Sequence, residues 1–123
     1  MAKVKQLTIF LENHPGALAQ VAQVLADAKV NILALLGSTS GQGGSAQVVV
    51  DNINKAKKAL AEAGKSYSEG TVEQFELNNK PGALAEVTAK LAKKGINIDS
   101  AFATVAKGAK KAMLFVATSQ PTA

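Results

Sequence analysis

Asn13-His14-Pro15-Gly16-Ala17-Leu18 is followed, 66 positions later (79 − 13), by a near copy of itself, Asn79-Lys80-Pro81-Gly82-Ala83-Leu84. The same offset relates the Asn31-Ile32 pair to the Asn97-Ile98 pair. The apolar residues between these motifs also match: Val21 and Leu25 in the first copy, Val87 and Leu91 in the second. A spacing held over this distance indicates an internal repeat, so the fold is predicted from the repeated segment.

Each copy lies between a strand-like segment and a helix-like segment. The preceding runs, Leu7–Leu11 and Val72–Leu77, have the apolar character of strands. The residues that follow are apolar at helical spacing: Leu18, Val21, Ala22 and Leu25, then Leu84, Val87, Thr88 and Leu91. Because proline near the first helical turn costs no hydrogen bond, we expect helices over about 15–28 and about 81–94.

Several properties make this strand-to-helix turn a candidate binding site. Gly16 and Gly82 let another group approach the backbone closely. The free N–H groups at the start of a helix, together with the helix dipole, favour an anion. Asn13 and Asn79 are expected to cap the helix or to form an Asx turn.

The order of these features resembles the signature of ACT domains. That signature is a strand, the motif Asn-x-Pro-Gly-x-Leu, an amphipathic helix, and an Asn-Ile pair that opens a second strand. Both halves carry it, over about residues 4–50 and 72–116, so the chain resembles a tandem ACT protein with no attached enzyme. The resemblance implies a ferredoxin-like α+β fold of βαββαβ repeats, with an antiparallel sheet and helices on one face. It also implies regulation, because ACT domains bind amino acids and control metabolic enzymes.

The first half contains every element of such a repeat. Asp51 or Asn52 is expected to cap a second helix, which Gly64 ends. Lys65–Ser68 is then predicted to form a short fourth strand, and Glu69-Gly70 a hinge. We therefore predict a complete first repeat at residues 1–70 and a second repeat at residues 71–123.

The second repeat is predicted to be truncated to βαββ. Its last strand-like run ends near Thr118, which corresponds to position 52 of the first copy (118 − 66), where the second helix begins. The repeat thus lacks the second helix and the fourth strand. Without these elements, the apolar residues of its sheet should be too little covered, which favours a homodimer or larger assembly. These apolar residues are Phe102, Val105, Phe115 and Val116.

The glycine-rich segment Ser40–Ser45 has two interpretations. It would cradle phosphate if it led into a helix, but it leads into the strand-like run Ala46–Val50, so we predict a β-hairpin. In the strand before it, alternation predicts Ile32, Ala34 and Leu36 on one face and Leu33 and Leu35 on the other. A strand that is apolar on both faces needs cover on both.

Composition excludes several classes of function. The 123 residues contain no Cys, which excludes disulfides and thiolate chemistry. No apolar run is long enough for a membrane helix and no signal-peptide pattern opens the chain, so we expect a cytoplasmic protein without membrane partners. The formal net charge is +5, but every basic residue is Lys, and without Arg nucleic-acid binding is unlikely.

The resemblance to ACT domains implies a ligand site at a domain interface near the turns. Asn13 and Asn79 would contact a bound amino acid, and Asn31 and Asn97 would close the pocket from the neighbouring domain. Serine-binding members often carry His two residues before the motif Asn, where this chain has Leu11 and Leu77, so a more apolar ligand is expected. The candidate ligand-binding residues are Asn13, His14, Pro15, Gly16, Ala17, Leu18, Asn31, Ile32, Asn79, Lys80, Pro81, Gly82, Ala83, Leu84, Asn97 and Ile98.

No arrangement of residues predicts catalysis, and we expect no enzyme activity, cofactor or metal. His14 is the only His; it is expected to be exposed, and the alternative is that it steers a ligand carboxylate. The predicted function is that of an amino-acid-binding sensor or regulator, with a separate metabolic enzyme or regulator as its partner. The alternatives are a protein–protein interaction module that binds no ligand and, third, a nucleic-acid-binding protein.

Overall fold

The computed structural model describes residues 2–41 and 43–119. They form two compact units. The first unit spans Lys5–Gly70, and the second unit combines the start of the chain, up to Val4, with the residues from Thr71 onward. No helix in the described part of the chain is long and apolar enough to cross a membrane.

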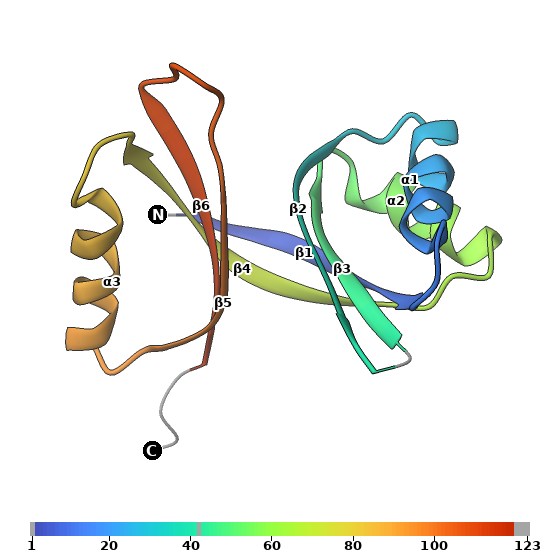
Figure 1. Cartoon of the computed structure of the whole chain (residues 1–123), viewed down its shortest axis with the longest axis horizontal. Coiled ribbons are helices and arrows are strands. Elements are labelled where there is room, and N and C mark those ends of the chain that lie inside the picture. Colours follow the sequence, from blue (N-terminus) through green and yellow to red (C-terminus); the bar gives the residue numbers. More distant parts are fainter. Residues whose placement is uncertain (1, 42, 120–123) are drawn as a thin grey trace. The chain divides into compact units, whose positions relative to one another are not determined.

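The first unit has the βαββαβ order that the repeat predicts. Its elements are β1 (Ala2–Glu12), α1 (Ala17–Asp27), β2 (Ile32–Ser40), β3 (Gly43–Val50), α2 (Ile53–Glu62) and the start of β4 (Tyr67–Asn78). The strand order is β2-β3-β1, and β3 pairs antiparallel with both neighbours. Both helices lie side by side against one face of these strands (Figure 1). The predicted α+β fold with an antiparallel sheet is confirmed.

The core of the first unit joins the two helices to the sheet. Leu7 and Ile9 of β1 are fully buried, because alternate strand residues point to the same face. Val21 and Leu25 of α1 meet them at helical spacing. The other buried members are Val30, Val48, Ala56 and Leu60. Burial of one such Leu or Ile side chain stabilises the fold by about 1.5–3 kcal/mol.

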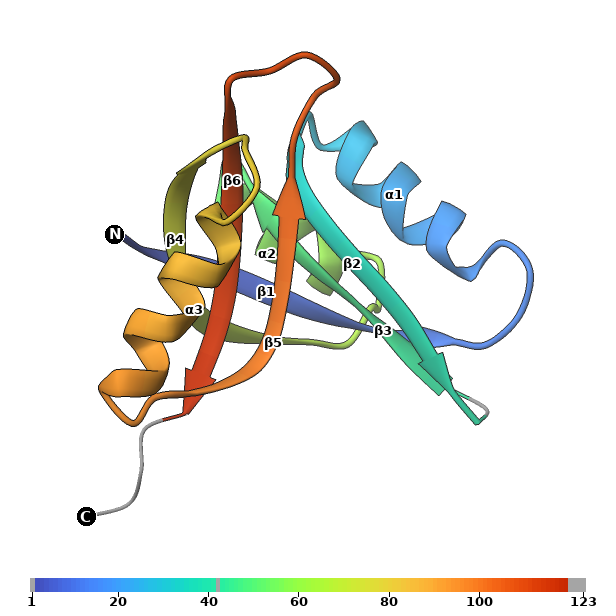
Figure 2. The ribbon, with the colours of Figure 1, turned by 60° about the vertical axis from the view of Figure 1, so that its left-hand side comes forward.

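The second unit has a smaller core under a single helix. Its elements are β4, α3 (Ala83–Lys93), β5 (Asn97–Thr104) and β6 (Lys111–Ser119), in the strand order β4-β6-β5. Figures 1 and 2 show α3 alone against one face of these strands. Leu91 of α3 packs on Leu114 and Val116 of β6. The predicted βαββ order of this repeat is confirmed for the described residues.

Two local signals of the first repeat have the predicted effect. Asn52 caps α2, because its Oδ1 accepts the Lys55 N–H at 3.1 Å. Gly64 ends the helix with a left-handed φ of 72°. The glycine-rich segment is a hairpin turn, since Ser40 of β2 pairs with Gly43 of β3; Gln42 lies outside the described residues.

The predicted hinge at Glu69-Gly70 is wrong. Tyr67–Asn78 forms one continuous strand, so the expected short fourth strand and the first strand of the second repeat are a single element. Glycine in a strand weakens it but does not end it when neighbouring strands supply hydrogen bonds. The chain therefore passes from one repeat to the next as strand, not as a loop.

A register shift in β2 alters its predicted faces. Ile32 pairs with Val50 and Ala34 pairs with Val49, so the shift between them is a β-bulge. Consecutive residues of β3 point to opposite faces, and Ile32 and Ala34 therefore do not share the face predicted for them. Leu33 and Leu35 are 48% and 45% exposed, so nothing within the described chain fully covers these two side chains.

The expectation of too little cover in the second repeat is wrong for two of the four residues it named, Phe115 and Val116. Val116 is fully buried beneath α3, and Phe115 is only 3% exposed. Phe115 also stacks on Phe102, with 5.5 Å between the ring centroids. Val105 alone fits the expectation, because 49% of its surface is exposed.

Candidate functional site

The repeated motif forms the same turn in both units. The His14 carbonyl accepts the Ala17 N–H at 3.2 Å, and Gly16 has φ 89° and ψ −9°. Proline followed by a residue with positive φ is typical of a type II turn. In the second unit the Lys80 carbonyl accepts the Ala83 N–H at 3.3 Å, and Gly82 has φ 89°. The prolines thus precede the helices, which begin later than predicted.

Backbone conformation, and not space, requires the two glycines. A Cβ atom built on Gly16 or Gly82 would meet no heavy atom within 4 Å. The φ of 89° at both positions is one that side chains with a Cβ rarely adopt. The open space above each glycine leaves the backbone accessible from that side.

The motif asparagines bond to the β-hairpin tips and do not cap the helices. The Asn13 side-chain amide donates to the Gly41 carbonyl at 2.9 Å, and that of Asn79 donates to the Ala109 carbonyl at 2.9 Å. The N-cap residues are the two glycines, with no side-chain cap bond. Of the two alternatives predicted for these asparagines, a helix cap or an Asx turn, the helix cap is therefore wrong. Each Asn connects its turn to the tip of the following hairpin.

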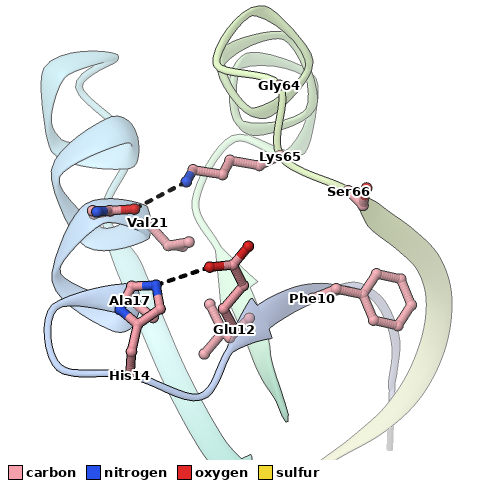
Figure 3. Close-up of a pocket in the computed structure, with 10 residues that line it drawn as sticks. Phe10, Glu12, His14, Ala17, Val21, Gly64, Lys65 and Ser66 are labelled. Carbon is pink, nitrogen blue, oxygen red and sulfur yellow. Dashed lines mark hydrogen bonds and ion pairs between the residues drawn. The ribbon is translucent and has the colours of Figure 1, made fainter. Parts of the chain in front are cut away.

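A cavity of about 360 Å³ lies beside the turn of the first unit (Figure 3). We call it the Lys65 cavity. One wall comes from the end of β1, the turn and α1, and the other from the connection between α2 and β4. The Phe10 N–H donates to the Ser66 carbonyl at 3.0 Å, which holds that connection next to β1. The lining residues are Phe10, Leu11, Glu12, His14, Ala17, Gln20, Val21, Gly64, Lys65 and Ser66.

Charges of both signs line the Lys65 cavity. The Lys65 Nζ donates to the Gln20 Oε1 at 3.2 Å, and the His14 Nε2 lies 3.0 Å from the Glu12 Oε2 (Figure 3). The His14 Nδ1 lies 2.9 Å from the Pro15 carbonyl oxygen. The hydrogen bond to that carbonyl, and then the one to Glu12, raise the pKa of His14 above its usual value. A protonated imidazole can donate to both oxygens at once.

A second cavity, of about 280 Å³, lies on the hairpin side of the same turn. We call it the Leu18 cavity. Its lining residues are Leu11, Glu12, Asn13, His14, Ala17, Leu18, Gly37, Ser38 and Thr39. Leu11, Glu12, His14 and Ala17 therefore line both cavities. Leu18 is 41% exposed and its counterpart Leu84 is 54% exposed, so these two leucines of the helical pattern lie outside the cores of their units.

The second unit has a smaller cavity at its own turn, of about 200 Å³. We call it the Lys80 cavity. It is lined by Glu76, Leu77, Asn78, Lys80, Ala83, Glu86 and Val87. Each of these residues stands 66 positions after one that lines the Lys65 cavity (76 − 10, 87 − 21). No counterpart of the Gly64–Ser66 wall exists among residues 2–41 and 43–119 of the structure.

The other predicted residues lie at the far end of each helix. Eleven residues of α1 separate the turn from Asn31 by about 16 Å, so within the first unit Asn31 does not reach either cavity. Its N–H donates to the Asp51 carboxylate at 2.9 Å, and the Asn97 side chain donates to Asp99 at 2.9 Å. Ile32 and Ile98 pack against the cores of their units.

Pro15, Pro81 and the motif glycines shape the turns without lining these cavities.

Of the ten residues that line the Lys65 cavity, only His14 and Ala17 are among the candidate ligand-binding residues that the sequence predicted. Glu12 and Gln20 lie close to the motif, and their helical or strand positions could have indicated them. Lys65 and Ser66 follow the glycine that ends α2, and no local pattern places them beside the turn. The hydrogen bond between Phe10 and Ser66 joins residues 56 positions apart (66 − 10).

Comparison with known proteins gives a consistent picture of the fold. The family model described as "ACT domain pair" matches residues 2–122. The crystal structure of protein BT0572 from Bacteroides thetaiotaomicron is similar, with 31% identity and a TM-score of 0.89, over 96% of this chain and 81% of that one. The ligand-free regulatory subunit of aspartate kinase from Thermus thermophilus has 15% identity and a TM-score of 0.70, over 94% and 87%. The corresponding subunit from Thermus flavus has 19% identity and a TM-score of 0.63, over 94% and 84%. No protein of curated function matches the chain.

Proposed function

Since this chain belongs to the family of ACT domain pairs, which it matches over residues 2–122, we propose that it is a non-catalytic regulatory protein. It binds a free amino acid beside the Asn-x-Pro-Gly turns. Two similar structures are those of regulatory subunits of aspartate kinase, which supports a regulatory role for an ACT pair.

The Lys65 cavity is the single observation that carries this proposal. Its volume of about 360 Å³ falls in the range of ligand-binding cavities, about 300–1,000 Å³. An α-amino acid carries a carboxylate and an ammonium, and the cavity offers a cation (Lys65), an anion (Glu12) and an imidazole whose pKa is raised (His14).

The apolar wall of the cavity indicates the kind of amino acid. Leu11, Ala17 and Val21 line it, and all three are buried or half-buried. Leu11 occupies the place where serine-binding members often carry His. A hydroxyl that reached this wall would lose its hydrogen bonds to water without replacement, whereas an apolar side chain gains by burial. We therefore expect an amino acid with an apolar side chain to bind more tightly than serine.

The same cavity argues against catalysis. Ser66 and His14 both line it, which invites comparison with a nucleophile and its base. A base must have a free ring nitrogen to accept the hydroxyl proton. Both ring nitrogens of His14 are occupied, one by Glu12 and the other by the Pro15 carbonyl.

Regulation would follow from linkage between ligand binding and conformation. A ligand shifts an equilibrium only by its different affinity for the two states, and a partner enzyme or regulator then responds to the favoured state. The alternative, an interaction module without ligand, predicts that no amino acid binds. Calorimetry and thermal unfolding with each of the twenty protein amino acids separate the two.

The expected result is a rise in melting temperature for a small set of amino acids. A ligand at a hundred times its Kd adds about 2.7 kcal/mol to the free energy of unfolding, which such a scan detects easily. If no amino acid at millimolar concentration changes the melting temperature, the proposal is wrong.

We also propose that the chain forms a homodimer. Large apolar side chains are exposed in both units, among them Leu33 and Leu35 on β2, an edge strand of the first unit. An exposed apolar edge strand favours pairing with a second chain. Light scattering at micromolar concentration should give the mass of a dimer, and a monomeric mass would contradict this.

A further inference from the structure

The backbone of Lys65 is held in place by the end of α2. The Lys65 N–H donates to the Leu60 carbonyl at 2.9 Å, and the Gly64 N–H donates to the Ala61 carbonyl at 3.1 Å. With Gly64 in the left-handed conformation, this pair of bonds is a Schellman motif. The position from which the Lys65 side chain starts is therefore fixed before any ligand binds.

The side chain of Lys65 crosses the cavity toward α1 (Figure 3). Its Nζ contacts the neutral Gln20 Oε1 at 3.2 Å and forms no ion pair with a carboxylate in the described residues. Glu12, the carboxylate that lines the cavity, contacts His14 instead. Lys65 thus brings a positive charge to the cavity that no neighbouring anion neutralises by direct contact.

We propose that Lys65 binds the α-carboxylate of the ligand, and that Gln20 holds the ammonium group in position until the ligand replaces it. This inference rests on the proposed amino-acid binding at the turn and specifies its chemistry. A carboxylate is a stronger acceptor for an ammonium group than an amide oxygen, so the exchange is favourable. The first unit is then the competent site.

The cavity of the second unit differs from the Lys65 cavity in the charged residues that line it, and these differences support the first unit as the competent site. At the position that corresponds to Gln20 the second unit carries Glu86, which contacts Lys90 at 3.6 Å. No residue of the Lys80 cavity takes the place of Lys65. Two carboxylates, Glu76 and Glu86, line that cavity together with Lys80, and each is already paired with another lysine, Lys111 at 4.0 Å and Lys90 at 3.6 Å. The two cavities should therefore differ strongly in their affinity for carboxylates.

Two substitutions test the role of Lys65 without disturbing the core. Lys65→Gln removes the charge and keeps a polar side chain of similar reach. Gln20→Glu, at an exposed position, supplies an internal carboxylate that pairs with Lys65 and competes with the ligand. Each should weaken binding of the amino acid roughly tenfold to hundredfold, as expected for loss of a hydrogen bond between charged groups. The matched controls, Lys58→Gln on α2 and Ala22→Glu on α1, change charge at exposed positions that line neither cavity of the first unit and should leave this affinity unchanged.

A comparison of ligands separates a direct contact from a structural effect. The probes are the twenty protein amino acids and, for the one that binds best, its C-terminal amide, which lacks the carboxylate. The wild-type chain should bind the acid roughly tenfold to hundredfold more tightly than the amide, and Lys65→Gln should lose most of this preference. If the variant prefers the acid as strongly as the wild type does, or if both variants bind it like the wild type, the role of Lys65 is refuted while amino-acid binding stands. If the wild type binds none of the twenty, both proposals fail together.

Discussion

The turns of the two units have the same geometry but border different cavities. Gly16 and Gly82 share a φ of 89°, and the asparagine of each copy donates to a hairpin carbonyl at 2.9 Å. Yet the Lys65 cavity measures about 360 Å³ and the Lys80 cavity about 200 Å³. The motif determines the turn, and the segments around it determine what the turn can bind.

The chemistry of the two cavities differs by substitution as well as by size. The first copy has Phe10, Glu12, His14 and Gln20 where the second has Glu76, Asn78, Lys80 and Glu86. The core of the first unit is also the larger one. Helix α2 adds Ala56 and Leu60 to it, whereas α3 is the only helix described in the second unit. The following substitutions test how far this difference extends.

The largest difference is expected for a core leucine in each unit. Leu60→Ala, at a fully buried position between α2 and the sheet, should lower the free energy of unfolding by about 2–5 kcal/mol. Leu91→Ala should cost less, because the residue is 5% exposed and its cluster has fewer fully buried neighbours. Urea denaturation monitored by circular dichroism measures both. An equal or larger loss for Leu91→Ala would contradict the difference in packing.

The glycines of the two turns should respond alike. Gly16→Ala and Gly82→Ala each place a Cβ on a backbone with φ 89°, which costs about 1–2 kcal/mol. The space around both is open, so strain of the backbone is the whole effect. Substitution by Asn, which tolerates positive φ better, should cost less in each unit. Different losses at the two positions would show that the turns are not equivalent.

The motif asparagines separate stability from ligand binding. Asn13→Ala and Asn79→Ala each remove one hydrogen bond to a hairpin tip, at a cost of about 0.5–1.5 kcal/mol in the free energy of unfolding. If Asn13 also contacts the ligand, its substitution alone should weaken amino-acid binding in calorimetry. Equal affinity in both variants would limit the two residues to the structural role.

The smallest effect concerns pH and is confined to the first unit. The raised pKa of His14 means that its interactions with the Pro15 carbonyl and Glu12 stabilise the fold most at low pH. This contribution is fully present below the unfolded pKa of about 6.5 and is lost as the pH rises through the higher folded value. His14→Gln should remove that part of the pH dependence, and NMR titration of the wild type should give a pKa above 6.5. Because the side chain is exposed, the change in melting temperature should be small.

The sequence alone determined the parts of this protein that depend on neighbouring residues. Proline followed by glycine limits φ over a few positions, and the period of apolar residues changes from strand to helix within one segment. The turns, the order of elements in both repeats, the hairpin, the cap at Asn52 and the end of α2 at Gly64 all follow from such local constraints. Because the motif recurs at an offset of 66 positions (79 − 13), the sequence also indicated the resemblance to tandem ACT domains.

The tertiary structure decided what those elements place side by side. The bond from Asn13 spans 28 positions, that from Lys65 to Gln20 spans 45, and no local pattern indicates either partner. The exposure of Leu18, the bulge in β2 and the continuity of β4 likewise depend on packing and strand pairing. Contacts between distant segments depend on the packing of the whole unit, because many side chains must fit together at once. The candidate site contains both kinds of information: a turn that the sequence specifies, and a lysine that only the folded chain brings to it.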